Sequence, residues 1–201
     1  MAGYQVRPLD PSTWPDFAEL AERHNGIWGG CWCMAFHAEM SRTDAGHNRA
    51  EKERRVREGT THAALVYDGD SCVGWCQFGP TEELPRIKYR REYEAGRGAL
   101  PDWRITCLFA DRHGRGVAAA ALAGALDEIA RLGGGTVESY PEDWDGREAG
   151  KCLPFMYNGP IDLFERQGFQ RVRRLGKHHW VVAKQVPASP SAPPGPRSAQ
   201  G

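Results

Sequence analysis

The residues best suited to chemistry lie in one segment, where an apolar run leads into glycines and then into alanines. It reads Ile-Thr-Cys-Leu-Phe-Ala-Asp-Arg-His-Gly-Arg-Gly-Val-Ala-Ala-Ala-Ala-Leu and occupies residues 105–122. This order predicts a strand, a glycine loop and a helix whose first backbone N–H groups have no partners. The helix dipole adds positive charge there, and glycines allow a phosphate to approach the backbone. The segment therefore predicts a pyrophosphate cradle, with Arg112 and Arg115 at its rim.

Two other phosphate-binding motifs fit this chain less well. A P-loop requires G-x-x-x-x-G-K-[ST], but residues 146–152 have one residue too few between the glycines and end in Cys152. A dinucleotide-binding G-x-G-x-x-A motif matches residues 114–119, with Glu138 near the expected acidic position. However, four polar or small residues separate the strand from Gly114, and fewer than about 50 ordered residues follow Glu138. These two features argue against a dinucleotide-binding protein, which remains the third hypothesis for the function of the chain.

Several motifs together resemble the GNAT family of N-acetyltransferases. Residues 113–118, His-Gly-Arg-Gly-Val-Ala, match the family signature [RQ]-x-x-G-x-[GA] with His at the first position. Residues 107–110 resemble the exit of its fourth strand, and residues 163–169, Leu-Phe-Glu-Arg-Gln-Gly-Phe, resemble its closing LYEKxGF element. The hairpin expected at 62–78 is similar to its second and third strands. The resemblance spans about residues 4–184 and implies transfer of an acetyl group from acetyl-CoA to an amine.

The resemblance also implies where acetyl-CoA binds. The pyrophosphate rests on the glycine loop, and the pantetheine runs between the diverging strands expected at 103–109 and 136–140. A backbone N–H near Leu108 then polarises the thioester. The cofactor-binding residues implied in this way are Leu108, Phe109, His113, Gly114, Arg115, Gly116, Val117 and Ala118.

The residues that transfer protons are less evident in the sequence. The family's usual general acid is the Tyr of LYEKxGF, but this chain has Phe164 at that position. Tyr157 is the expected substitute, with a buried structural tyrosine as an equal alternative. Glu138 is the expected general base, ahead of Asp102 and Glu142. The alternative interpretation is that Glu138 is an ordinary solvent-facing residue of its strand. The missing acid and base keep open a non-catalytic acyl-CoA-binding module as the second hypothesis.

A dense group of aromatic and thiol residues precedes the expected charged helix at 48–58. Residues 31–37 read Cys-Trp-Cys-Met-Ala-Phe-His, which could form half of a zinc site, but the C-x-C spacing is tight and no second pair follows. We therefore expect no metal. The interpretation favoured here is a wall of the acceptor pocket, with core packing as the alternative. The substrate-binding residues expected on that basis are Trp28, Trp32, Cys33 and Phe36.

This aromatic wall and the insertion at 80–101 favour a small-molecule amine as the acceptor. A protein N-terminus or a lysine side chain is the alternative acceptor. The acidic and basic residues balance at 26 each, which argues against a nucleic-acid partner. No apolar run reaches the roughly 18–20 residues of a membrane span, so no membrane partner is expected. A homodimer is left open.

The elements that must position these residues fit one domain of the 201-residue chain. We expect that domain at 1–186, followed by a disordered tail at 187–201 that is rich in Pro, Ser and Ala. No signal peptide is visible, so a cytoplasmic protein with reduced cysteines is expected. The expected strands are 4–8, 62–67, 72–78, 103–109, 136–140, 169–174 and 179–184. Their order predicts an α/β (α+β) fold with a mixed, mostly antiparallel central sheet of six to seven strands and helices on both faces.

Overall fold

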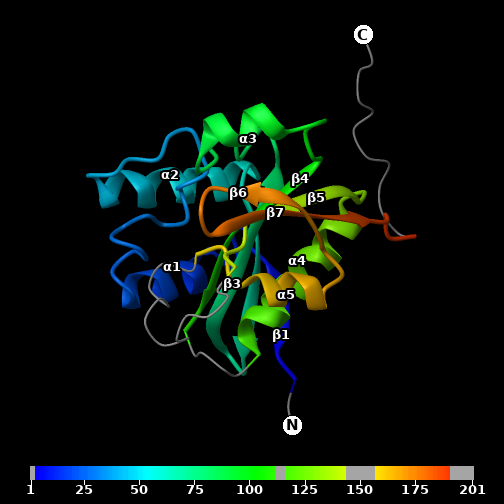
Figure 1. The fold of residues 1–201 in the computed structure, drawn as a ribbon. Coiled ribbons are helices and arrows are strands. Elements are labelled where there is room, and N and C mark those ends of the chain that lie inside the picture. The colour runs from blue at the N-terminus through cyan, green and yellow to red at the C-terminus, as the bar shows by residue number, and fades with distance from the viewer. Residues whose placement is uncertain (1–2, 112–115, 144–156, 191–201) are drawn as a thin grey trace.

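A computed structural model of the chain describes residues 3–111, 116–143 and 157–190. Its strands lie in the middle of the molecule and its helices lie outside them (Figure 1). The strands are β1 (Gln5–Pro8), β2 (His62–Asp68), β3 (Ser71–Pro80), β4 (Trp103–Ala110), β5 (Gly135–Ser139), β6 (Gln170–Leu175) and β7 (His179–Val186). The helices are α1 (Trp14–Arg23), α2 (Ala45–Glu58), α3 (Arg90–Gly96), α4 (Val117–Arg131) and α5 (Ile161–Arg166).

The strands form one seven-stranded sheet in the order β1-β2-β3-β4-β5-β7-β6. Neighbouring strands are antiparallel except for β4 and β5, which are parallel. The expected mixed, mostly antiparallel sheet is therefore confirmed. The single parallel pair matters for function because its two strands point their carboxyl ends in the same direction.

Helices cover both faces of this sheet. Alternate residues of β2 point to opposite faces, so Ala64 and Val66 join the core cluster that contains α4, whereas Leu65 joins the cluster that contains α1. On α4 the residues at helical spacing, Val117, Ala121, Ala125 and Ile129, are all buried. The 3–4 spacing of these four residues and Leu132 in the sequence predicts one buried face, which is confirmed for the four; Leu132 is the C-cap and is partly buried.

The insertion between β3 and β4 differs from the sequence-based expectation. The composition of residues 80–101 predicts a connection with about one helical turn, but α3 is seven residues long. Its one buried side chain, Tyr93, donates from its hydroxyl group to Glu138 Oε2 over 2.8 Å. Contact with β5 therefore holds this short helix in place, since a helix of seven residues is marginal by itself.

The first residues of the tail expected at 187–201 contact the domain. Ser189 donates its backbone N–H to the carbonyl of Ala130, near the end of α4, over 2.8 Å. Residues 191–201 of that expected tail lie outside the described residues. In the part of the chain that the structure describes, no helix has both the length and the apolar character needed to cross a membrane.

Candidate active site

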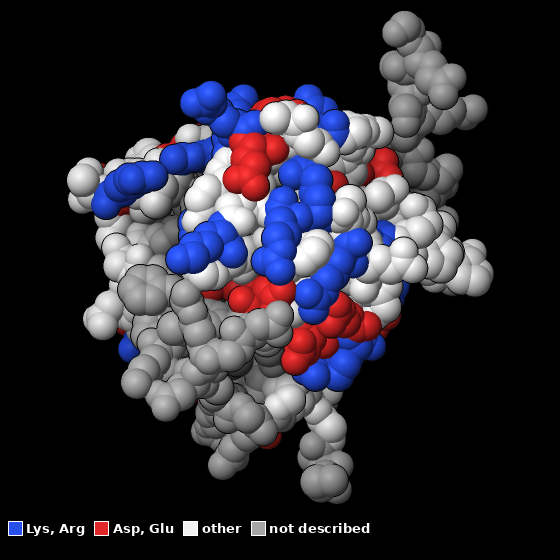
Figure 2. Space-filling model, viewed as in Figure 1, with Lys and Arg blue, Asp and Glu red and all other residues white. Residues whose placement is uncertain are grey.

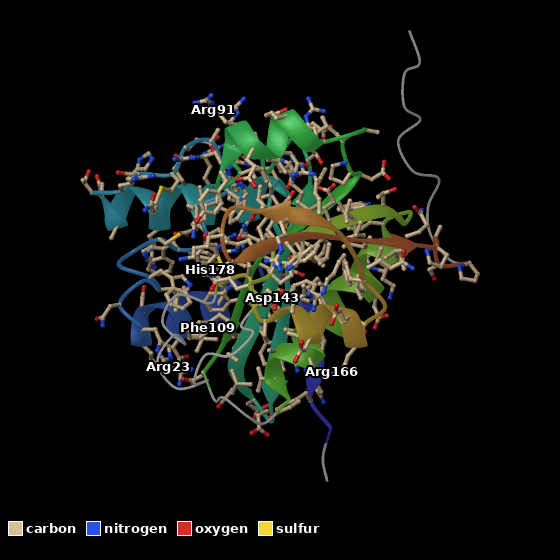
Figure 3. The ribbon with its side chains drawn as sticks, viewed as in Figure 1. Arg23, Arg91, Phe109, Asp143, Arg166 and His178 are labelled. Atoms are coloured by element: carbon tan, nitrogen blue, oxygen red, sulfur yellow. The ribbon has the colours of Figure 1, made fainter. Side chains whose placement is uncertain are left out.

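The parallel strands β4 and β5 pair over only three residues and then separate. Their partners are Trp103 with Val137, Arg104 with Glu138 and Ile105 with Ser139. β5 ends at Ser139, whereas β4 continues to Ala110. Phe109 near the end of β4 and Asp143 beyond the end of β5 are labelled in Figure 3. An open strand edge therefore lies at the centre of the sheet.

A β-bulge lies on β4 where the separation begins. Gln77 of β3 is opposite Cys107 and Phe78 is opposite Ile105, which leaves Thr106 without an opposite residue. Bulges bend a strand and redirect the groups that follow, and they are frequent beside active sites. The bulge thus sets the direction of the β4 backbone at Leu108.

The backbone N–H of Leu108 is directed away from β3 and is already bound to a carbonyl oxygen. It donates to the carbonyl of Tyr157 over 2.7 Å. The resemblance described above places the thioester oxygen of acetyl-CoA at a backbone N–H near Leu108. Its geometry suits a carbonyl acceptor, but a thioester oxygen must displace that of Tyr157. Phe109, the neighbouring expected residue, packs instead on Trp75, with ring centroids 4.7 Å apart.

The glycine loop leads directly into α4. His113, Gly114 and Arg115 of the expected cradle lie outside the described residues. Gly116 is the N-cap of α4 and has φ +81°, in the left-handed region that favours glycine. A Cβ atom added there would meet nothing within 4 Å. Of the next two expected residues, Val117 is buried and Ala118 is partly exposed.

A cavity of about 300 Å³ lies beside the separated strands. It is formed by residues between α1 and α2, by the insertion between β3 and β4, and by Tyr157. Its lining residues are Ala35, Phe36, Met40, Arg42, Arg86, Ile87, Lys88 and Tyr157. The rings of Phe36 and Tyr157 are 6.3 Å apart. The structure therefore brings an expected acceptor-wall residue and the expected general acid to one cavity.

Tyr157 connects this cavity to the open edge of β4, because its ring lines the cavity while its carbonyl binds the Leu108 N–H. Burial raises the pKa of Tyr157 well above its usual value, and the nearby Glu142 carboxylate raises it further. The phenol therefore keeps its proton at neutral pH. A protonated phenol at this position is able to donate a proton to a leaving group.

His179 is a polar residue of this region that the sequence analysis did not single out. Its Nδ1 lies 3.0 Å from the carbonyl oxygen of Tyr140, so Nδ1 carries the hydrogen and Nε2 is the acceptor. Lys88 Nζ lies 3.3 Å from Nε2, and Glu142 Oε1 lies 3.5 Å from it. Burial lowers the pKa of His179, which favours the neutral ring. No local sequence signal marks this residue, because its partners come from distant elements.

Glu138, the expected general base, accepts hydrogen bonds from two phenols. Tyr93 donates over 2.8 Å and Tyr140 donates over 3.2 Å, both to Oε2. The buried Arg104, opposite Glu138 on β4, donates to the hydroxyl of Tyr93. Glu138 thus lies in the paired part of the two strands, before they separate.

The four expected acceptor-wall residues occupy different environments. Trp32 is 4% exposed and packs against Trp14 and Phe17, and Cys33 accepts a hydrogen bond from Trp75 over 2.9 Å. Both belong to the core between the sheet and α1, and Trp28 is 38% exposed. Of the four, Phe36 lines the cavity described above. Within the described ranges, no group of three or more His, Cys, Asp or Glu residues is placed to hold a metal ion.

Charges are mixed on the face drawn in Figure 2. Basic side chains lie over β6, and acidic side chains lie over α3 and α5 on either side of them (Figure 2). The β6 arginines are partly compensated, since Arg171 forms ion pairs with Glu165 and Asp143. Among the described residues of this face, the basic groups therefore do not form the continuous positive surface that nucleic acids require.

The fold is similar to those of solved acetyltransferase structures. A protein from Desulfovibrio desulfuricans assigned to the GNAT acetyltransferases is 15% identical, with 92% of this chain and 99% of that chain covered at a TM-score of 0.53. A protein from Salmonella typhimurium, classed as an acetyltransferase and solved with its cofactor acetyl-CoA, is 14% identical, with 94% and 97% covered at 0.51. The ribosomal-protein-S5-alanine acetyltransferase of Vibrio fischeri is 12% identical, with 92% and 94% covered at 0.51.

These likenesses span nearly the whole chain, and they show that it has the fold of GNAT acetyltransferases. The identities are too low to carry a reaction or a substrate from one chain to the other. A scan against models of known protein families found no match, and a search of curated proteins found none.

Proposed function

We propose that this chain is an acetyl-CoA-dependent N-acetyltransferase that acylates a small-molecule amine by direct attack. The observation that carries the proposal is the separation of β4 from β5 at a bulge, with the Leu108 N–H holding a carbonyl oxygen in the gap. A backbone donor preset for a carbonyl oxygen is the element that acyl transfer needs, because negative charge develops on that oxygen.

The residues that begin α4 fit the phosphate end of acetyl-CoA. The open space at Gly116 allows a phosphate to approach the backbone, and the first turn of α4 supplies N–H groups at Val117 and Ala118. Acetyl-CoA supplies the acetyl group as a thioester. Leu108 donates its N–H to the thioester oxygen once the Tyr157 carbonyl has moved aside. The solved Salmonella typhimurium protein, which shares this fold and binds acetyl-CoA, supports the choice of cofactor.

For the acid step we propose Tyr157, whose phenol borders both the cavity and the open edge of β4. It takes the place of the tyrosine that Phe164 replaces. Phe164 is fully buried and packs edge-to-face on Phe169, so it has a structural role. Attack by the amine forms the amide bond and breaks the carbon–sulfur bond. The leaving thiolate takes the phenol proton, the base takes the proton that the amine loses, and this proton then returns to the phenolate.

For the base step we propose Glu142, with His179 beside it, in place of Glu138. Two phenols and the nearby Arg104 hold the carboxylate of Glu138 in the paired part of the strands. Glu142 lies next to Tyr157, and its charge contributes to the raised pKa of that phenol. Its carboxylate is therefore assigned the proton of the attacking amine.

A small acceptor is supported by the shape of the cavity. Residues 35–42 and 86–88 lie on two sides of it, and the backbone N–H of Arg86 donates to the Phe36 carbonyl over 3.0 Å. This hydrogen bond joins the two segments that line the cavity. A volume of about 300 Å³ is at the lower end of the range for small-molecule sites.

The experiment that tests the proposal measures free thiol released from acetyl-CoA in the presence of a panel of amines. Amine-dependent release at a rate proportional to enzyme is expected. Acetyl-CoA that raises the melting temperature without any amine-dependent release would favour the non-catalytic acyl-CoA-binding module. A shift with NAD and none with acetyl-CoA would favour the dinucleotide-binding alternative and contradict the proposal.

A further inference from the structure

Three basic side chains surround the cavity that Tyr157 borders. Arg42, Arg86 and Lys88 lie among the apolar groups of its lining, which include Phe36. Its described lining residues contain no carboxylate. A cavity of this kind is electropositive, although the chain as a whole carries equal numbers of acidic and basic residues.

The contacts that these cations make are with neutral groups. Arg86 Nη1 donates to the carbonyl of Met40 over 3.3 Å, and Lys88 Nζ donates to His179 Nε2 over 3.3 Å. Of the nearby carboxylates, Glu39 pairs with Arg55 over 2.6 Å. Glu142 Oε1 lies 3.5 Å from the His179 nitrogen that Lys88 contacts, and Glu142 is not part of the cavity lining. Among the described residues, no carboxylate lies within 4.0 Å of the three cations to neutralise them.

We propose that the acceptor is an amine that also carries an acid group, a carboxylate or a phosphate, and that Arg42, Arg86 and Lys88 bind this acid group. The proposal rests on the function proposed above and names its substrate class. An amine without an acid group enters such a cavity as a cation and is repelled. An anionic group is attracted, and an arginine can bind it through two parallel hydrogen bonds.

The same positive charges assist the amine as a nucleophile. They disfavour the ammonium form of a bound amine and so favour the neutral form that attacks. The apolar part of the acceptor contacts Phe36 and the ring of Tyr157, which line the cavity. Because the carbonyl of Tyr157 lies at the Leu108 N–H, the amine points toward β4 and the acid group points toward the cations.

Matched pairs of acceptors test the proposal. Thiol release from acetyl-CoA is compared for tyrosine and tyramine, which differ in a carboxylate, and for phosphoethanolamine and ethanolamine, which differ in a phosphate. At least one acid-bearing member is expected to have a kcat/KM about tenfold or more above its partner, as one charge-assisted contact provides. The pair that shows this difference identifies the acid group.

Variants assign the preference to the cavity. In the double variant Arg42→Gln and Lys88→Gln, both at exposed positions, the preference should fall to about twofold or less while the KM for acetyl-CoA stays within about twofold. The control is Arg91→Gln, an exposed arginine on α3 that is labelled in Figure 3 and is not part of the cavity lining. It should keep the full preference.

The outcomes separate this proposal from the general one. Equal use of both members of each pair overturns it even if the enzyme is active. A rise in the KM for acetyl-CoA in the double variant overturns it too, because the cations then bind the phosphates of CoA. If no amine releases thiol, the melting temperature is measured with each acceptor instead. A rise in the melting temperature with an acid-bearing acceptor that is lost in the double variant supports the site. No such rise in the wild type refutes the site.

Discussion

Replacing Gly116 by alanine separates the cost of a backbone conformation from the loss of a binding site. Gly116 has φ +81°, and Gly59, at the C-terminal end of α2, has φ +67°. A Cβ atom at either position meets nothing within 4 Å. Both substitutions therefore cost only the left-handed conformation, about 1–2 kcal/mol for a residue with a Cβ atom. Gly59→Ala is thus a matched control for Gly116→Ala.

The two variants should differ in the binding of acetyl-CoA and not in stability. For a chain of this length each 1 kcal/mol lowers the melting temperature by about 2–4 °C, so both variants should melt about 2–8 °C below the wild type. A methyl group at Gly116 also stands where a phosphate must approach the first turn of α4. We expect the Kd for acetyl-CoA to rise by about tenfold or more in Gly116→Ala, a loss of about 1.4 kcal/mol.

Calorimetric titration of acetyl-CoA into the two folded variants measures this difference. Gly59→Ala should bind within about twofold of the wild type, because it leaves α4 unchanged. If Gly116→Ala has the melting temperature of Gly59→Ala but binds acetyl-CoA with wild-type affinity, the pyrophosphate does not bind at Gly116 and the prediction is refuted. An equal loss of affinity in both variants would also refute it, since the loss would then follow stability.

Three further predictions concern titratable groups. Burial and nearby cations lower the pKa of His37 to about 2 from its ordinary 6.5, so the stability that the neutral ring provides is complete above pH 6.5 and is lost as the pH falls below it. Urea denaturation should show a loss of about 2 kcal/mol in the free energy of unfolding of the wild type at pH 5. This loss should be smaller in His37→Asn and as large as in the wild type in the exposed control His47→Asn. An equal loss in all three proteins would contradict the prediction. Tyr157→Phe should lower kcat by about 100-fold in the thiol-release assay. Glu142→Gln should lower kcat by a similar factor, whereas Glu138→Gln should change it less; an unchanged kcat in Glu142→Gln would show that the base lies elsewhere.

Much of the fold could be predicted because its signals are local. The apolar runs at 62–67 and 72–78 on either side of Asp-Gly-Asp-Ser predict the β2–β3 hairpin, and the 3–4 spacing of apolar residues predicts α4. The glycine that begins α4 could be recognised from sequence because only glycine tolerates φ +81° without strain. In these elements the backbone conformation depends on residues only a few positions apart, so the local sequence pattern is sufficient to predict them.

The insertion between β3 and β4 shows where such local patterns end. The segment at 90–95 is short and is followed by Gly96 and Gly98, so the sequence predicts about one helical turn. The two turns of α3 depend on Tyr93, whose hydroxyl binds Glu138 from 45 positions away. Likewise, Trp32 and Cys33 have the residue types of an acceptor wall, but the packing of α1 on the sheet places them in the core.

The sequence by itself therefore determined the elements, their order and the candidate cradle, since each depends on residues that are close along the chain. Only the tertiary structure decided which side chains share the cavity. Lys88 and His179 are 91 positions apart, and they meet because β7 inserts between β5 and β6. The carbonyl of Tyr157 reaches the Leu108 N–H because β4 and β5 separate there. Contacts of this kind depend on strand order and register, which no periodicity within one segment encodes.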